Sequence, residues 1–219
     1  MKTFDFYEFA GVLAPGAVTL FGVSLICPNL NVALHSKEFT VGDLGLFVIL
    51  AYVAGHLTQA IGNIVVEQLW WKVRGGMPTD WIRSGQGNLL PEIQVKAMEE
   101  QIPAKLGLSQ PVQLERITDK EWFGVTRQIY AAVAAQSRAG RVDIFNGNYG
   151  LNRGISAALL LLSLLVLVNS LSGWKVAFLL LVGASIAVYR MDRFGKHYAR
   201  ELFVQFLQMP NPKPEEERK

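Results

Sequence analysis

The sequence predicts an all-α protein: a four-helix transmembrane bundle with a small helical cytoplasmic domain. Three observations lead to this class. Of the 219 residues, 51% are hydrophobic, the charged residues lie in blocks, and the blocks separate four apolar runs of near-membrane length. The formal net charge of +3 comes from 21 basic and 18 acidic residues, which is too balanced to indicate a nucleic-acid partner.

Each apolar run is a predicted membrane span, since a spanning helix needs about 20 apolar residues. The runs are 9–27, 44–66, 155–171 and 174–189. The first two form an N-terminal hairpin within 1–66, and the last two form a C-terminal hairpin within 154–190. Turn-forming residues separate the last two, because one helix across both would be too long for a bilayer. We expect the first run to be a retained span, since it lacks a signal-peptide cleavage pattern.

The Lys and Arg residues near the spans predict the orientation of the chain. The side facing the middle segment and the tail is rich in them, whereas the opposite side offers only Lys37 and Lys175. The positive-inside rule therefore places both the middle segment and the tail in the cytoplasm. An even number of spans places the N-terminus there as well.

The middle segment, 67–153, is predicted to be a cytoplasmic helical domain. A short helix is expected from about 92 to 101, with Pro103 as its end. Thr118 and Glu121 have the spacing of a capping box, which predicts a longer helix after them. That helix has an apolar face, to be covered either by the other cytoplasmic helix or by the same helix of a second subunit.

The fourth span has no predicted end at the membrane surface, because no proline occurs between Trp174 and Gln208. Residues 191–209 are therefore expected to continue the span as a cytoplasmic helix. Residues 210–219 are proline-rich and charged, which predicts a disordered tail. The aliphatic stretch 155–168 predicts a helix that faces lipid.

The second span carries five polar residues at helical spacing, which predicts a polar transmembrane stripe on one helix face. Its members are Tyr52, His56, Gln59, Asn63 and Glu67. Polar groups in a span are costly, so the stripe is a candidate path for conduction, a ligand or protons. The alternative is that these side chains only hold the bundle together by hydrogen bonds to neighbouring helices or subunits.

A second candidate site is the membrane-proximal cluster, where the fourth helix is expected to leave the bilayer. Its members are Arg153, Arg190, Asp192, Arg193, Lys196, His197, Arg200 and Glu201. His197 and Glu201 have an i, i+4 spacing that two metal ligands can use, but no third ligand is evident. We therefore expect a solvated charged face and assign no metal. No catalytic motif or cofactor site is evident, so no catalytic residue is assigned.

Small residues crowd the first span between Ala10 and Ala17, which predicts close helix packing. Pro15 interrupts this run, so a hinge for gating is the alternative role. Two stretches that include these residues, 6–16 (FYEFAGVLAPG) and 51–57 (AYVAGHL), resemble segments of poorly characterised bacterial membrane proteins. Some of those proteins are components of anti-phage defence systems. The resemblance implies a bacterial inner membrane and a membrane-acting effector or sensor.

The function predicted from these features is that of an oligomeric four-span inner-membrane effector or sensor, as a pore or signal-coupled component of a bacterial defence system. Its expected partners are the lipid bilayer, further copies of itself and a soluble cytoplasmic protein, with no direct nucleic-acid contact. Two alternatives stay open. One is a membrane-embedded enzyme that uses His56, Asn63 and Glu67, together with the basic residues after the fourth span, on a lipid-like substrate. The other is an anchor or scaffold for a soluble partner.

Overall fold

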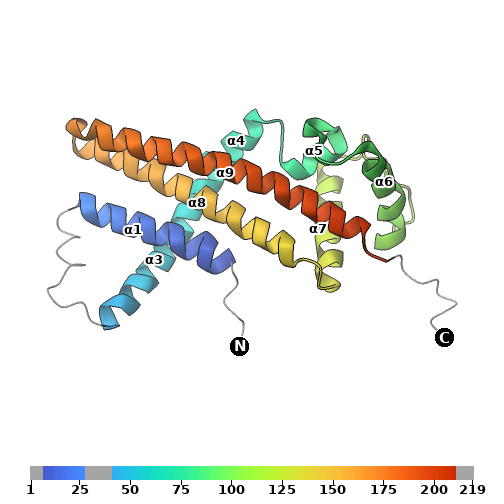
Figure 1. Cartoon of the computed structure of the whole chain (residues 1–219), viewed down its shortest axis with the longest axis horizontal. Coiled ribbons are helices and arrows are strands. Elements are labelled where there is room, and N and C mark those ends of the chain that lie inside the picture. The colour runs from blue at the N-terminus through green and yellow to red at the C-terminus, as the bar shows by residue number, and fades with distance from the viewer. Residues whose placement is uncertain (1–6, 28–40, 211–219) are drawn as a thin grey trace. The chain divides into compact units, whose positions relative to one another are not determined.

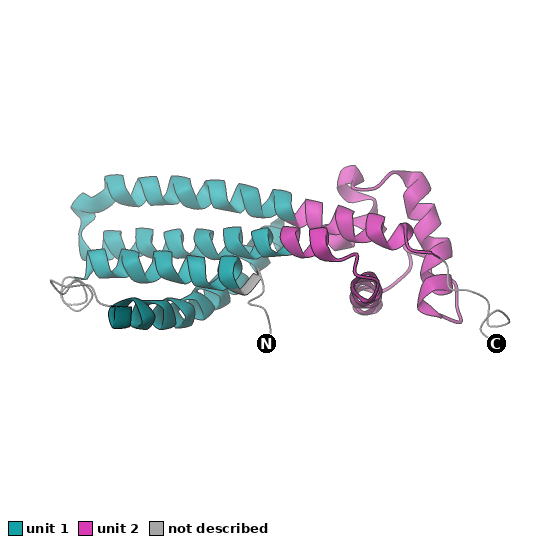
Figure 2. Cartoon of the chain, turned by 60° about the horizontal axis from the view of Figure 1, so that its bottom comes forward, with its two compact units in different colours: residues 1–74, 146–194 teal, residues 75–145, 195–219 magenta. Residues whose placement is uncertain are grey.

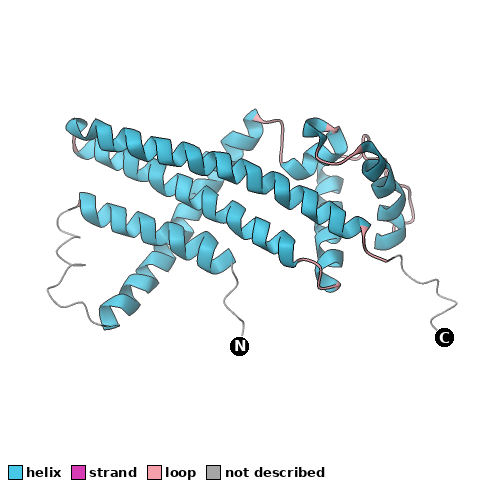
Figure 3. Ribbon diagram, viewed as in Figure 1, coloured by secondary structure: helices cyan, strands magenta, loops and turns pink. Residues whose placement is uncertain are grey.

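The computed structural model of the chain describes residues 7–27 and 41–210, so all of the expected tail 210–219 except its first residue lies outside this range (Figure 1). The described part is helical and contains no strand (Figure 3). Its α-helices are α1 (Ala14–Ile26), α3 (Val41–Ile61), α4 (Gln68–Val73), α5 (Pro78–Ser84), α6 (Glu92–Leu106), α7 (Asp119–Ala135), α8 (Gly140–Asn169) and α9 (Trp174–Leu207). The shorter elements are the π-helical η1 (Tyr7–Leu13) and η2 (Gly62–Glu67) and the 3-10 turns η3 (Gln86–Asn88) and η4 (Leu171–Gly173).

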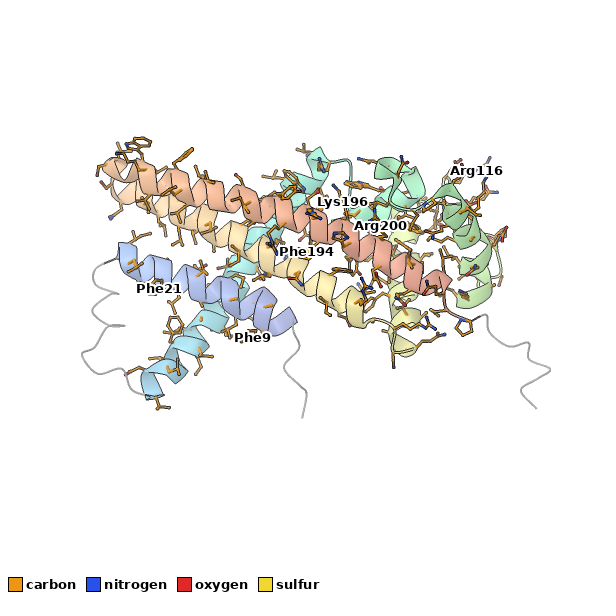
Figure 4. The ribbon with its side chains drawn as sticks, in the orientation of Figure 1. Phe9, Phe21, Arg116, Phe194, Lys196 and Arg200 are labelled. Atoms are coloured by element: carbon orange, nitrogen blue, oxygen red, sulfur yellow. The ribbon has the colours of Figure 1, made fainter. Side chains whose placement is uncertain are left out.

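Four helical stretches of the described residues are long and apolar enough to cross a membrane. They are Phe9–Ile26, Val41–Ser84, Gly140–Asn169 and Leu171–Leu207. These stretches indicate a multi-pass membrane protein of the class that the sequence predicts. Large apolar side chains such as Phe9 and Phe21 are exposed on them, as lipid contact requires (Figure 4).

The helices extend beyond the apolar runs that predicted them. α8 begins at Gly140, well before residue 155, and α3 continues through η2 and α4 to Val73. The apolar length of a run marks where a helix can meet lipid, but it does not mark where the helix ends. No proline or positive-φ residue interrupts residues 140–154, so the helix continues through this polar stretch.

The chain forms two compact units, and the first consists of residues 1–74 and 146–194 (Figure 2). Within it, α1 crosses α3 at two glycines. A Cβ atom at Gly16 would lie 1.8 Å from the carbonyl oxygen of Ala51, and one at Gly55 would lie 2.2 Å from that of Val12. The two backbones are therefore in direct contact, which is the packing role that the small residues of the first span predict.

α8 also packs inside this first unit. Ser156, Ala157, Ala158 and Leu162 are buried, so the aliphatic stretch 155–168 faces other helices along one side and does not face lipid all round. Ser163 Oγ, for example, donates a hydrogen bond to the carbonyl oxygen of Ala177 at 3.0 Å. Small side chains at these positions allow the close approach of neighbouring helices.

The second unit consists of residues 75–145 and 195–219. Its core contains Trp122 of α7 and Phe203 of α9, whose rings stack with centroids 5.7 Å apart. The apolar face of α7 is therefore covered by the C-terminal part of α9 in the same chain. α9 was not among the expected partners, because nothing in the sequence indicates that the continuation of the fourth span contributes to the core of this unit.

Pro103 does not end α6, contrary to the prediction. The helix continues to Leu106 and stops at Gly107, whose φ of +67° suits glycine. Proline lacks the N–H that would bond to the carbonyl four residues earlier, but one such loss is tolerated where packing holds the turn. Here Met98 and Ile102 are completely buried on the inner side of the same helix.

The capping box at the start of α7 is confirmed, and it carries a testable prediction. Thr118 donates hydrogen bonds to the carboxylate of Glu121 from its hydroxyl at 2.7 Å and from its N–H at 3.0 Å. These bonds hold the pKa of Glu121 below its usual value of 4.5. A lowered carboxyl pKa means that this stabilisation is present above pH 4.5 and is lost as the pH falls through the lowered value.

Thr118→Ala should therefore weaken the first turn of α7 by about 1 kcal/mol at neutral pH and raise the pKa of Glu121 toward its usual value. Hydrogen exchange of the first-turn amides and an NMR titration of Glu121 measure the two effects. Thr126→Ala is the matched control, because the Thr126 hydroxyl donates to a carbonyl of its own helix, that of Trp122. Equal exchange rates in the two variants would contradict the prediction.

Candidate functional site

The centre of the candidate site is the side-chain amide of Gln59 on α3, which is buried in the first unit. Its Nε2 donates hydrogen bonds to the carbonyl oxygens of Gly11 and Gly150, the latter at 2.9 Å. Its Oε1 accepts two hydrogen bonds from Arg153, from Nε at 3.0 Å and from Nη2 at 2.9 Å. Every donor and acceptor position of the amide is thus occupied.

The carbonyl of Gly11 is free to accept this bond for a reason visible in the sequence. In an α-helix that carbonyl would accept from the N–H four residues later, but residue 15 is a proline and has no N–H. Gly11 also lies in η1, where the turn is wider than in an α-helix. Pro15 therefore exposes a backbone acceptor toward Gln59, rather than only bending the helix.

Arg153 links Gln59 to a carboxylate. Its Nη1 donates to Oε2 of Glu67, the last residue of η2, in an ion pair whose side chains are only 10% and 22% exposed. The guanidinium also lies over the ring of Tyr149, 5.5 Å from its centroid. We call Arg153, Gln59, Glu67 and the carbonyls of Gly11 and Gly150 the Arg153 cluster.

A second polar group in the same unit is centred on Asp192 of α9. Its carboxylate is buried and accepts from Arg74 Nη2 at 3.0 Å and from Trp70 Nε1 at 3.2 Å. From the residue next to Trp70, Trp71 Nε1 donates to the hydroxyl of Tyr149 at 2.8 Å. The segment that follows η2 is therefore fixed by polar contacts to both α8 and α9.

Two π-helical segments, η1 and η2, each contribute to the Arg153 cluster. Gly11 belongs to η1 and Glu67 belongs to η2. Such segments are rare and occur frequently at functional sites, because the extra residue re-aims nearby side chains and carbonyls. Glu67 is turned toward Arg153 by this wider turn at the end of α3.

The polar stripe of the second span divides between two environments. Gln59 and Glu67 take part in the Arg153 cluster, whereas the side chains of His56 and Asn63 are exposed. Tyr52 is half-buried, and its ring packs edge-on against His56 with centroids 4.6 Å apart. The structure thus separates two inward-facing members from two outward-facing ones.

The membrane-proximal cluster is also divided. In the first unit, Arg153 and Asp192 are buried in the contacts described above. Arg190 lies over the Phe194 ring at 5.5 Å, and Arg193 is exposed. The cluster is therefore not a uniformly solvated face, because Arg153 and Asp192 lie in the interior of the first unit whereas Arg193 is exposed.

In the second unit, the remaining members of that cluster contact α5, α8 and the segment before α6 (Figure 4 labels Lys196 and Arg200). Their partners are the Trp81 ring for Lys196, the Phe145 ring for His197, the Leu89 carbonyl for Arg200 and Arg141 for Glu201. In the described part of the chain, no group of three His, Cys, Asp or Glu residues has the arrangement of a metal site. These contacts indicate that the cluster contributes to packing within the unit.

The second unit contains a cavity of about 580 Å³ with charged residues of both signs in its lining. Arg83 and Lys96 contribute positive charge, and Glu92 and Glu99 contribute negative charge. Arg83 also donates to the carbonyl of Ile117 at 2.7 Å and pairs with Asp119, which orders the cavity wall. A further cation, Lys105, donates to the last carbonyls of α9, and burial together with Arg138 lowers its pKa.

Several site features were not identified in the sequence. The acceptor role of Gly11 and Gly150 is one, and the pairing of Arg74 with Asp192 is another. A proline four residues after Gly11, within a span, was the available signal for the first. No local signal exists for the second, because the two residues are 118 positions apart.

Comparison of the chain with family models, with curated proteins and with solved structures gave no match.

Proposed function

We propose that this chain is a gated membrane effector or sensor that assembles from several copies and responds to a soluble cytoplasmic protein. The proposal is based on the Arg153 cluster. This cluster contains an ion pair and an amide whose hydrogen-bonding positions are all occupied, and it lies among helices apolar enough to span a bilayer. Ionisable groups within spans are costly and are by default candidates for function.

The connectivity of the cluster favours a switch over a simple structural bond. A buried ion pair gives little net stability, and its best-attested use is to specify one arrangement among several. Here it connects η1 through Gly11, η2 through Glu67 and α8 through Arg153. Loss of the Arg153 contacts would release all three segments together, which is what a two-state element requires.

Other features support the proposed location and the proposed partner. The distribution of Lys and Arg favours a cytoplasmic position for the second unit, with both termini on the same side. Its charged cavity and the exposed Ile93 and Phe123 support a role in binding a soluble protein. The bacterial inner membrane and a place in anti-phage defence rest on the resemblance of 6–16 and 51–57 noted above.

Dye efflux from vesicles tests the gate. Wild-type protein should hold the dye, whereas Glu67→Gln should release it, because the substitution removes the charge that fixes Arg153 while keeping a hydrogen-bonding side chain. Glu201→Gln, in which the lost carboxylate pairs with Arg141 in the second unit, is the control and should hold the dye. Circular dichroism and gel filtration confirm that each variant is folded.

The proposal fails if folded Glu67→Gln holds the dye as well as the wild type does. A further pair of substitutions separates the two halves of the stripe. If dye efflux from vesicles that contain the Glu67→Gln variant is unchanged when His56→Leu and Asn63→Leu are added, the exposed residues His56 and Asn63 have no part in conduction.

The enzyme alternative receives less support from the site. His56 and Glu67 are about 16 Å apart along one helix at 1.5 Å per residue, and Glu67 is bonded to Arg153. The scaffold alternative is favoured by one observation, the second unit's own core around Trp122 and Phe203. It predicts that this unit retains function when it is fused to unrelated spans.

A further inference from the structure

The second unit contains another cavity, of about 570 Å³, which shares no lining residue with the cavity described above. We call it the Asp80 pocket. Its lining includes Phe123, Arg127 and Tyr130 of α7, Tyr198 of α9 and Asp80 of α5. The three residues of α7 are spaced by four and three, so they lie on one face of that helix. A cavity of this size, with aromatic walls and few polar groups, is typical of a site for a small molecule.

The walls of the Asp80 pocket are fixed by hydrogen bonds within the chain. Trp122 Nε1 donates to the carbonyl oxygen of Thr79 at 3.0 Å, which connects α7 to the start of α5. The hydroxyl of Tyr130 donates to Oδ1 of Asp143, near the start of α8, at 2.8 Å. Because these bonds form without a ligand, the pocket is preformed, and a ligand that enters it has little protein to order.

The two charges of the Asp80 pocket are not paired with each other. In the part of the chain that the structure describes, neither Asp80 nor Arg127 forms an ion pair. The cation whose charge acts on Asp80 is Arg83, which is already paired with Asp119. The guanidinium of Arg127 lies over the Phe123 ring, 5.5 Å from its centroid, and stacking of this kind leaves the N–H groups able to donate. The pocket therefore offers a carboxylate and a guanidinium to one ligand.

We propose that the Asp80 pocket binds a phosphorylated organic amine, with its ammonium group at Asp80 and the aromatic rings and its phosphate at Arg127. Aromatic faces attract alkylammonium groups, and the half-buried carboxylate of Asp80 gains a counter-charge. A guanidinium binds phosphate through two parallel N–H bonds. A simple cation would be repelled by Arg127 and a simple anion by Asp80, so a ligand that carries both charges fits best. Phosphocholine and phosphoethanolamine have this chemistry, either as free molecules or as lipid headgroups.

Titration calorimetry of the full chain in uncharged maltoside micelles tests the site of the ammonium group. Phosphocholine should bind about 10-fold more tightly than dimethylbutyl phosphate, its neutral isostere with carbon in place of the ammonium nitrogen. Asp80→Asn should remove this preference, since asparagine keeps an acceptor for the Met77 N–H but loses the charge. Glu100→Gln, at an exposed position of α6 outside the pocket, should keep it. Wild-type protein that binds both probes equally, or does not bind phosphocholine, would overturn the proposal.

A second pair of probes tests the site of the phosphate. Wild-type protein should bind phosphocholine about 10-fold more tightly than choline, and Arg127→Gln should remove that difference. Lys120→Gln is the matched control, because Lys120 is an exposed cation of the same helix that does not line the pocket. Circular dichroism shows whether each variant is folded. A folded Arg127→Gln variant that still prefers phosphocholine over choline would refute the position given to the phosphate.

The source of the ligand is distinguished by a short-chain lipid, dihexanoylphosphatidylcholine. Tighter binding of this lipid than of phosphocholine identifies a membrane lipid, and equal affinities identify the free phosphorylated amine. The lining of the Asp80 pocket belongs to the second unit, so the proposal does not depend on the gate at the Arg153 cluster. Absence of phosphocholine binding would refute the pocket alone, whereas dye retention by folded Glu67→Gln would refute the gate alone.

Discussion

Replacing Gly55 with alanine should destabilise the first unit by about 3 kcal/mol or more, the upper end of the cost of overpacking. The new Cβ would lie 2.2 Å from the carbonyl oxygen of Val12, and backbone atoms cannot rotate away as a side chain can. α1 and α3 would have to separate, which would also stretch the bond between Thr19 and Thr58. Thermal unfolding in detergent measures the loss.

Gly45→Ala is the matched control for this prediction. Gly45 belongs to the same helix, but a Cβ atom there would meet nothing within 4 Å. Because alanine favours a helix over glycine by about 1 kcal/mol, this variant should be as stable as the wild type or slightly more stable. Gly16→Ala should reproduce the loss from the other helix. Similar melting temperatures for Gly45→Ala and Gly55→Ala would refute the close crossing.

Arg153→Met should cost about 3 to 5 kcal/mol, as expected when one partner of a buried ion pair is removed. The substitution leaves Glu67 without its cation and removes both donors to Gln59 Oε1. Equilibrium unfolding in mixed micelles measures the change. Arg193→Met is the control, since Arg193 lies on α9 with its side chain exposed, and its loss should have little effect.

The double variant Arg153→Met with Glu67→Leu shows how the two charges are coupled. It should recover part of the stability lost in Arg153→Met, because the second substitution removes the carboxylate that the first leaves unpaired. If the two single effects simply add, the ion pair is not what holds Arg153 in place. The cluster would then depend on Gln59 and on the stacking with Tyr149 instead.

The helical fold was predictable because it depends on local features of the sequence, namely the lengths of the apolar runs and the positions of the prolines. Four long apolar runs must become helices if they enter a bilayer, since no other open structure satisfies the backbone there. The capping box at Thr118 depends on a few adjacent residues, and it is found where the sequence predicts it. Helix ends were less predictable, since packing held α6 together through Pro103.

The candidate site was predictable only in part. Helical spacing identified Gln59 and Glu67 as members of one polar face, but it also grouped them with His56 and Asn63, which face outward. The division depends on which side of α3 its neighbours occupy, and it is further changed by the wider turn of η2. Both are properties of the tertiary fold. Likewise, nothing local predicts that Arg153, assigned to a solvated cluster, pairs with Glu67 inside the bundle.

The Arg153 cluster also bears on how the chain is made. Gln59 precedes Gly150 by 91 residues and Arg153 by 94, so its amide emerges from the ribosome long before these partners. At translation rates of about 5 to 20 residues per second, the delay is roughly 5 to 20 s. During that interval the nascent N-terminal spans hold an incompletely satisfied amide, and the arrival of α8 completes it. Assembly is therefore finished only when the third span inserts, so a chain truncated before α8 should be a substrate for membrane quality control.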